Sequence, residues 1–155
     1  MSTGKKLPED LERRLKPCPL DWKRVDRFMK RARQDLKSAQ VLKSDDLEGA
    51  YEFLYDCMLH GGLGYLASRS VQPDIRGKHK TVIDYISYAL PKRYESKIQF
   101  YDRMRKKRHQ LIYEPGPMGC TEKEFAEAAL VAREFLELIE NALRVENPQY
   151  SAKHI

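Results

Sequence analysis

The sequence lacks any hydrophobic run near the length of about 20 residues that a membrane-spanning helix needs. Its first residues are charged and contain no apolar core of a secretion signal, so we expect a cytoplasmic protein without a membrane partner. Cysteine is scarce: Cys18, Cys57 and Cys120 lie far apart and outside any Cys/His cluster. This spacing favours free thiols over a disulfide framework or a zinc site, and we expect neither a metal nor a cofactor.

The alternation of apolar and polar residues that marks a half-buried strand is also absent. Apolar residues instead recur every three to four positions, which is the spacing of one buried helix face. This spacing predicts helices over residues 21–43, 47–70, 79–90, 92–113 and 121–144, with the fourth ended by Pro115-Gly116-Pro117. The predicted fold class is therefore all-α, an up-and-down bundle of four to five helices.

Three segments follow from this reading. Residues 1–20 contain three prolines among charged residues and are predicted to be a flexible basic arm with one helical turn near residues 9–15. Residues 21–145 form the helical domain, and residues 146–155 form a C-terminal tail.

Gly61, Gly62 and Gly64 lie within the second predicted helix, where each weakens the helix by about 1 kcal/mol relative to alanine. Close approach of another backbone would explain them.

Positive charge is concentrated in one helix. The chain has 29 Lys and Arg residues against 23 Asp and Glu residues, a net charge of +6. Residues 92–109 carry eight positive and two negative side chains, whereas residues 110–147 carry three positive and eight negative ones. Either the basic helix and the acidic helix after it attract each other, or the basic helix meets phosphate.

The basic helix also places an arginine on its apolar stripe. Arg108 lies four residues after Met104 and four before Ile112. A buried arginine is costly unless it is paired or borders a cleft, and Asp35 beside the apolar face of the first helix is one candidate partner.

Three neighbours of Arg108 share a helix face, because Arg105, His109 and Tyr113 are spaced four residues apart. Arginine can grip a phosphate with two hydrogen bonds, and histidine can move a proton near neutral pH. Together these groups make a minimal site for RNA cleavage by the ribose 2′-hydroxyl, which requires no metal. The alternative is that His109 is an ordinary surface or interface histidine.

Several strings, taken in order, resemble the HEPN (higher eukaryotes and prokaryotes nucleotide-binding) domain family. They are residues 28–39, residues 49–60, Gly77-Lys78-His79, and the run from Arg105 to Tyr113. The last run resembles the family signature, an arginine followed by a polar residue and, a few positions on, a histidine. Here Arg108 and His109 begin an Arg-His-x-x-x-Tyr pattern, with Tyr113 in place of the usual histidine of Arg-Asn-x-x-x-His. A second register pairs Arg103 with His109.

The resemblance implies a HEPN-like bundle that forms a homodimer around a shared cleft. It implies either a metal-independent endoribonuclease of toxin or defence type, or a protein that only binds RNA or a nucleotide. Tyr113 leaves both open, because tyrosine is a poor base near neutral pH. The expected catalytic residues are Arg108, His109 and Tyr113, the expected nucleic-acid-binding residues are Arg103, Arg105, Lys106 and Lys107, and the secondary candidates are Asp35 and His79.

A different class of function is an interaction module without catalysis. In that case the basic helix docks an acidic partner protein such as an antitoxin. A nucleotidyltransferase is another partner that the resemblance suggests.

Overall fold

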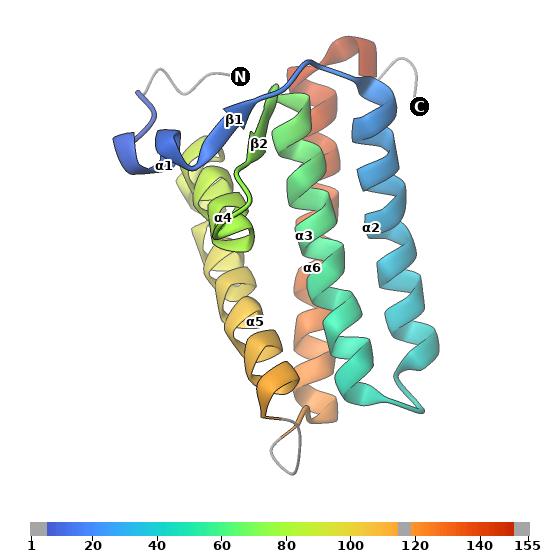
Figure 1. Ribbon diagram of the computed structural model, residues 1–155. Helices are drawn as coiled ribbons and strands as arrows, with labels where there is room; N and C mark the ends of the chain where they lie inside the picture. The colour runs from blue at the N-terminus through green and yellow to red at the C-terminus, as the bar shows by residue number, and fades with distance from the viewer. Residues whose placement is uncertain (1–5, 115–118, 151–155) are drawn as a thin grey trace.

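The fold is a helical bundle built around one central helix. The computed structural model describes residues 6–114 and 119–150. The central helix, α3, has α2 on one side, α4 and α5 on the other, and α6 behind it in the view of Figure 1. The helix bounds are α2 Trp22–Leu42, α3 Leu47–Ser68, α4 Lys78–Ala89, α5 Glu95–Tyr113 and α6 Glu122–Glu146, with a short 3-10 helix, η1, at Lys92–Tyr94. The prediction of a helical bundle is confirmed.

Helices α2, α3 and α6 begin where the sequence offers side chains that satisfy free backbone donors. The Asp21 side chain accepts a hydrogen bond from the backbone of Lys23 at the start of α2. At the start of α6, Thr121 and Glu124 form the reciprocal capping box that their spacing predicted. Such local signals are the reason that these helix starts could be placed from the sequence.

The N-terminal arm differs from the prediction. Residues 9–17 form a short helix, α1 (Glu9–Arg13), and a strand, β1 (Leu15–Pro17), which pairs antiparallel with β2 (Val71–Pro73). Arg14 fixes the arm to α4 by hydrogen bonds to Asp84 Oδ2 at 2.9 Å and Thr81 Oγ1 at 3.1 Å. This part of the arm is therefore tied to the bundle. Strands of three residues are too short to display an alternating pattern, which is why both were missed.

The glycines of α3 allow neighbouring helices to pack closely. A Cβ at Gly62 would lie 2.6 Å from Val82 Cγ1 of α4, and one at Gly64 would lie 2.8 Å from Met29 Sδ of α2. The groups that approach are therefore side chains, and not the neighbouring backbone that the sequence suggested.

The remaining predictions concern the ends and the surface. The Pro115–Pro117 break and residues 151–155 of the tail lie outside the described residues. Tyr150 of the tail packs on Trp22, with the ring centroids 5.3 Å apart.

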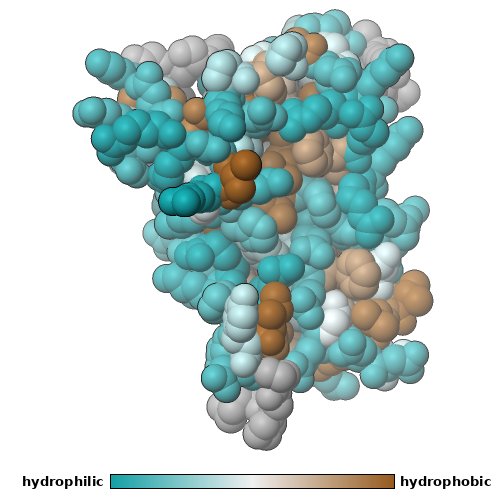
Figure 2. Space-filling view, viewed as in Figure 1, coloured by the Kyte–Doolittle hydropathy of each residue, from teal (hydrophilic) through white to brown (hydrophobic). Residues whose placement is uncertain are grey.

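All three cysteines are free thiols. The described helices include none that is long and apolar enough to span a bilayer. The face in Figure 2 is mostly hydrophilic, with hydrophobic side chains in small separate groups.

Candidate functional site

Arg108 lies where α5 faces α3, at the edge of the core. Its guanidinium carbon is 5.4 Å from the centroid of the Tyr55 ring, and its Nε atom is 3.8 Å from Asp56 Oδ1. That Nε atom is buried and has no hydrogen-bond acceptor among the described residues. Arg108 is thus held by an aromatic face and a distant carboxylate, which leaves its hydrogen-bonding capacity largely unused.

The carboxylate next to Arg108 is not the one considered from the sequence. Asp35 is buried and binds Arg31 of its own helix and His60 of α3. The carboxylate beside Arg108 is Asp56, which α3 presents toward α5. The suggested Asp35–Arg108 pair is therefore wrong, because the central helix supplies a nearer acid to α5 and a nearer base to Asp35.

His79, the other secondary candidate, does belong to this site. Its Nδ1 atom shares a hydrogen bond of 2.9 Å with the hydroxyl of Tyr55, the residue whose ring underlies Arg108. Burial lowers the pKa of His79 below its usual value, and the positive charges of Arg108 and Lys78 lower it further. His79 is therefore uncharged at neutral pH and orients Tyr55 beneath the guanidinium.

His109 and Tyr113 occupy a different part of α5. Both are exposed, and their ring centroids lie 4.6 Å apart. They form an aromatic pair on the solvent side of the helix. No ring, ion-pair or hydrogen-bond contact in the described part of the chain joins this pair to Arg108. The three expected catalytic residues therefore do not gather into one cluster within a single chain.

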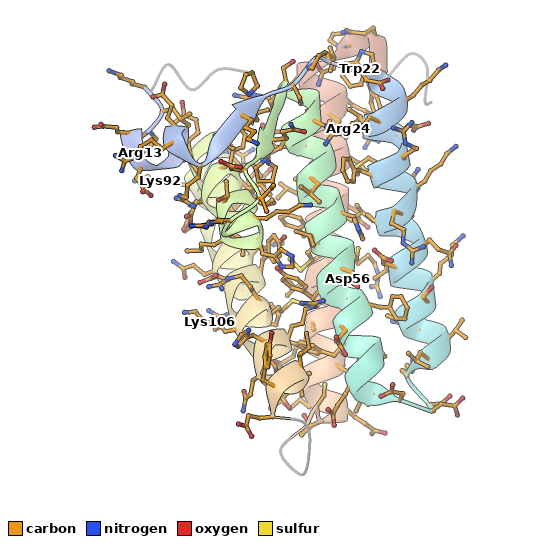
Figure 3. The ribbon with its side chains drawn as sticks, viewed as in Figure 1. Arg13, Trp22, Arg24, Asp56, Lys92 and Lys106 are labelled. Atoms are coloured by element: carbon orange, nitrogen blue, oxygen red, sulfur yellow. The ribbon has the colours of Figure 1, made fainter. Side chains whose placement is uncertain are left out.

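The four expected nucleic-acid-binding residues diverge as well. Arg105 and Lys106 both pair with Asp102, at 2.9 Å and 3.7 Å. Lys106 lies on the outer side of α5 (Figure 3), whereas Lys107 points toward α6, where it binds Glu124 Oε2 at 2.9 Å. The basic helix and the acidic helix thus attract each other in part, as one of the two charge interpretations predicted.

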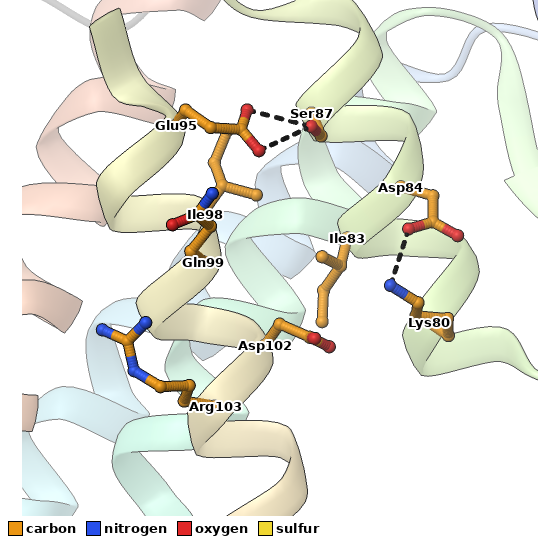
Figure 4. A pocket seen from close by; sticks show the side chains of 9 residues that line it. All are labelled: Lys80, Ile83, Asp84, Ser87, Glu95, Ile98, Gln99, Asp102 and Arg103. Carbon is orange, nitrogen blue, oxygen red and sulfur yellow. Dashed lines mark hydrogen bonds and ion pairs between the residues drawn. The ribbon is translucent and has the colours of Figure 1, made fainter. Parts of the chain in front are cut away.

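Arg103 lines a cavity of about 290 Å³ between α4 and α5 (Figure 4). The acidic lining residues Asp84, Glu95 and Asp102 outnumber the basic ones, Lys80 and Arg103. A cavity with that balance repels a phosphate. Arg103 thus lines a cavity whose lining does not include Arg108.

Two residues that the sequence reading missed lie beside the Arg108 site. His60 Nδ1 is 2.6 Å from Asp35 Oδ2, and His60 follows Asp56 by one helical turn on α3. Burial raises the pKa of Asp56, Arg108 lowers it, and Asp35 raises it again, so these charges interact. The spacing of Arg31 to Asp35 and of Asp56 to His60, four residues in each case, was the available signal in the sequence.

Comparison of the chain with models of known families, with curated proteins and with solved structures found no match. Within residues 6–114 and 119–150, no group of three His, Cys, Asp or Glu side chains is placed to hold a metal ion. The geometry around Arg108 is therefore the feature of the molecule that points to a function.

Proposed function

We propose that this chain is a HEPN-like RNA-binding protein in which Arg108 grips a backbone phosphate. The observation that carries the proposal is the state of Arg108. Tyr55 and Asp56 position it, its side chain is about a quarter exposed, and its Nε atom has no hydrogen-bond acceptor among the described residues. A phosphate oxygen would accept hydrogen bonds from its terminal nitrogens. Such charge-assisted bonds contribute about 1.5–3 kcal/mol each.

The surroundings favour a polyanion over a small anion. Lys106 is exposed on the outer side of α5, and Arg31 of α2 is half-exposed beside the Asp35–His60 pair, so positive side chains other than Arg108 are open to solvent on two helices of the bundle. A chain of phosphates can contact several of them at once, whereas a single phosphate ion reaches one. In a homodimer, two copies of α5 would double this positive surface, and we include a dimer in the proposal.

The test is titration of a fluorescent single-stranded RNA with the protein over a range of salt concentrations. The variants are Arg108→Ala, Arg108→Lys and, as a matched control, Arg133→Ala, which removes the same charge from an exposed position on α6. We expect Arg108→Ala to weaken binding roughly tenfold or more, since 1.4 kcal/mol is a factor of ten, and Arg108→Lys to restore only part of the loss. Equal effects of Arg108→Ala and Arg133→Ala, or no binding at low salt, would refute the proposal.

One observation favours docking of an acidic protein as the second candidate function. Ile112 and Tyr113 are 42% and 69% exposed at the end of the basic helix. Exposed apolar side chains beside positive charge suit a protein partner better than RNA. In the same titration, loss of RNA affinity in Arg108→Ala but not in Ile112→Ser would argue against this candidate.

A further inference from the structure

We propose that His60, oriented by Asp35, is the proton acceptor for cleavage of RNA whose phosphate is held by Arg108. This inference rests on the proposed function and extends it from binding to catalysis. It assigns the catalytic base to α3, in the centre of the bundle, and not to the signature helix, where Tyr113 stands in place of a histidine.

The first support is the geometry of the Asp35–His60 pair. Asp35 is 1% exposed, and an ionised carboxylate can only accept hydrogen bonds, so His60 Nδ1 carries the proton of their 2.6 Å contact. With the proton on Nδ1, an uncharged ring has its lone pair on Nε2, which is the atom that can take a proton from a substrate. Arg31 holds the other oxygen of Asp35 at 2.8 Å and so fixes the carboxylate.

The second support is the position of this pair relative to Arg108. Asp56 and His60 are four residues apart on α3, which places their Cβ atoms roughly 5–6 Å from each other on one helix face. Asp56 is also the carboxylate beside Arg108. The order across the surface is therefore Arg108, Asp56, His60, with about a quarter of the His60 and Arg108 side chains exposed to solvent. The proposal requires that one ribose and its 3′ phosphate span that interval.

The chemistry is balanced without a co-reactant. His60 Nε2 takes the proton of the ribose 2′-hydroxyl, and the 2′ oxygen forms a bond to the adjacent phosphorus. The bond from phosphorus to the 5′ oxygen breaks, and that oxygen leaves with the electron pair and takes up a proton from water. The products are a 2′,3′-cyclic phosphate and a 5′-hydroxyl end. Arg108 binds the phosphate oxygens, whose negative charge grows in the transition state.

A purely structural role would use the same hydrogen bond, because a buried carboxylate needs partners. His60→Asn distinguishes the two roles, since the asparagine amide keeps a donor toward Asp35 but offers no atom that accepts a proton at neutral pH. His60→Gln is the second variant, in case the asparagine chain does not fold. Glu137→Gln is the control, because it changes an exposed side chain on α6 that has no part in the proposed site.

The experiment measures RNA affinity, the rate of RNA cleavage in EDTA, and the thermal midpoint for each variant. We expect cleavage by the unaltered protein, a loss of about 100-fold or more in His60→Asn, as expected for removal of a general base, and no such loss in Glu137→Gln. RNA affinity and the thermal midpoint should stay close to those of the unaltered chain.

Failure of this inference is distinguishable from failure of the proposed function. RNA that is bound but left intact, or cleaved equally well by both His60 variants, overturns the catalytic assignment and leaves RNA binding in place. Absence of RNA binding overturns both.

Discussion

Gly62 offers the sharpest test of how the bundle positions its site. This glycine on α3 lies under α4, the helix that carries His79. In Gly62→Ala the new methyl carbon would lie 2.6 Å from Val82 Cγ1 and 2.9 Å from Ile86 Cδ1. Both distances are far inside normal carbon contact, so α4 must shift or its side chains must leave their rotamers. Val82 is stiff because it branches at Cβ, so it cannot retreat easily.

Two opposing effects set the size of the change. Replacing glycine by alanine in a helix interior gains about 1 kcal/mol of helix stability. Forcing one methyl group into a filled core costs typically 1–3 kcal/mol. The short distances at Gly62 place its cost at the upper end of that range, so the overpacking wins, with a net loss of up to roughly 2 kcal/mol. At Gly61 the new carbon meets nothing closer than Leu136 Cδ1 at 3.4 Å, so Gly61→Ala keeps most of its gain.

The assay is thermal unfolding of the two variants beside the unaltered chain, followed by circular dichroism. For a domain of this size 1 kcal/mol shifts the midpoint by about 2–4 °C. We expect Gly62→Ala to unfold several degrees lower and Gly61→Ala to unfold at the same temperature or higher. If the two neighbouring variants shift the midpoint equally and in the same direction, the close packing of α4 on Gly62 is wrong.

Two further predictions concern titration and reactivity. The backbone N–H of Thr121 and the ammonium of Lys107 hold the pKa of Glu124 below its usual value. The ionised Glu124 therefore stabilises the fold fully at neutral pH, and this stabilisation is lost as the pH falls through the lowered pKa. Glu124→Gln should make the free energy of unfolding depend less on pH in the acid range, and an unchanged dependence would contradict this. Burial raises the pKa of the Cys57 thiol to about 12. In the folded protein, iodoacetamide should therefore modify half-buried Cys18 long before Cys57, which peptide mass spectrometry can follow. Early labelling of Cys57 would show that the core opens readily.

The sequence predicted the long helices well because their signals are local. The start of α2 at Trp22 follows an aspartate cap, and the start of α6 follows the Thr121–Glu124 box. The β1–β2 pair has no such signal, since it depends on Pro17 and Val71 meeting across more than 50 positions of the chain. Only the packed bundle brings those segments together.

The site was predicted in part for the same reason. The position of Arg108 on an apolar stripe correctly marked it as unusual, and His79 does reach it through Tyr55. The acids were assigned wrongly, because helical spacing indicates which residues share a face but not which neighbouring helix that face meets. Asp35 faces α3 and Asp56 faces α5, which requires knowing that α3 is central.

The attachment of the N-terminal arm has a consequence for the order of folding. The side-chain partners of Arg14 lie 67 and 70 positions later in the chain, on α4. The strand β1 pairs with β2, which is also distant in the sequence. During synthesis the arm leaves the ribosome before α4 and must wait until α4 has emerged, whereas α2 and α3 can already pack together. Contacts between distant positions form late and open early. In hydrogen exchange, the amides of β1 should therefore exchange well before those of α3.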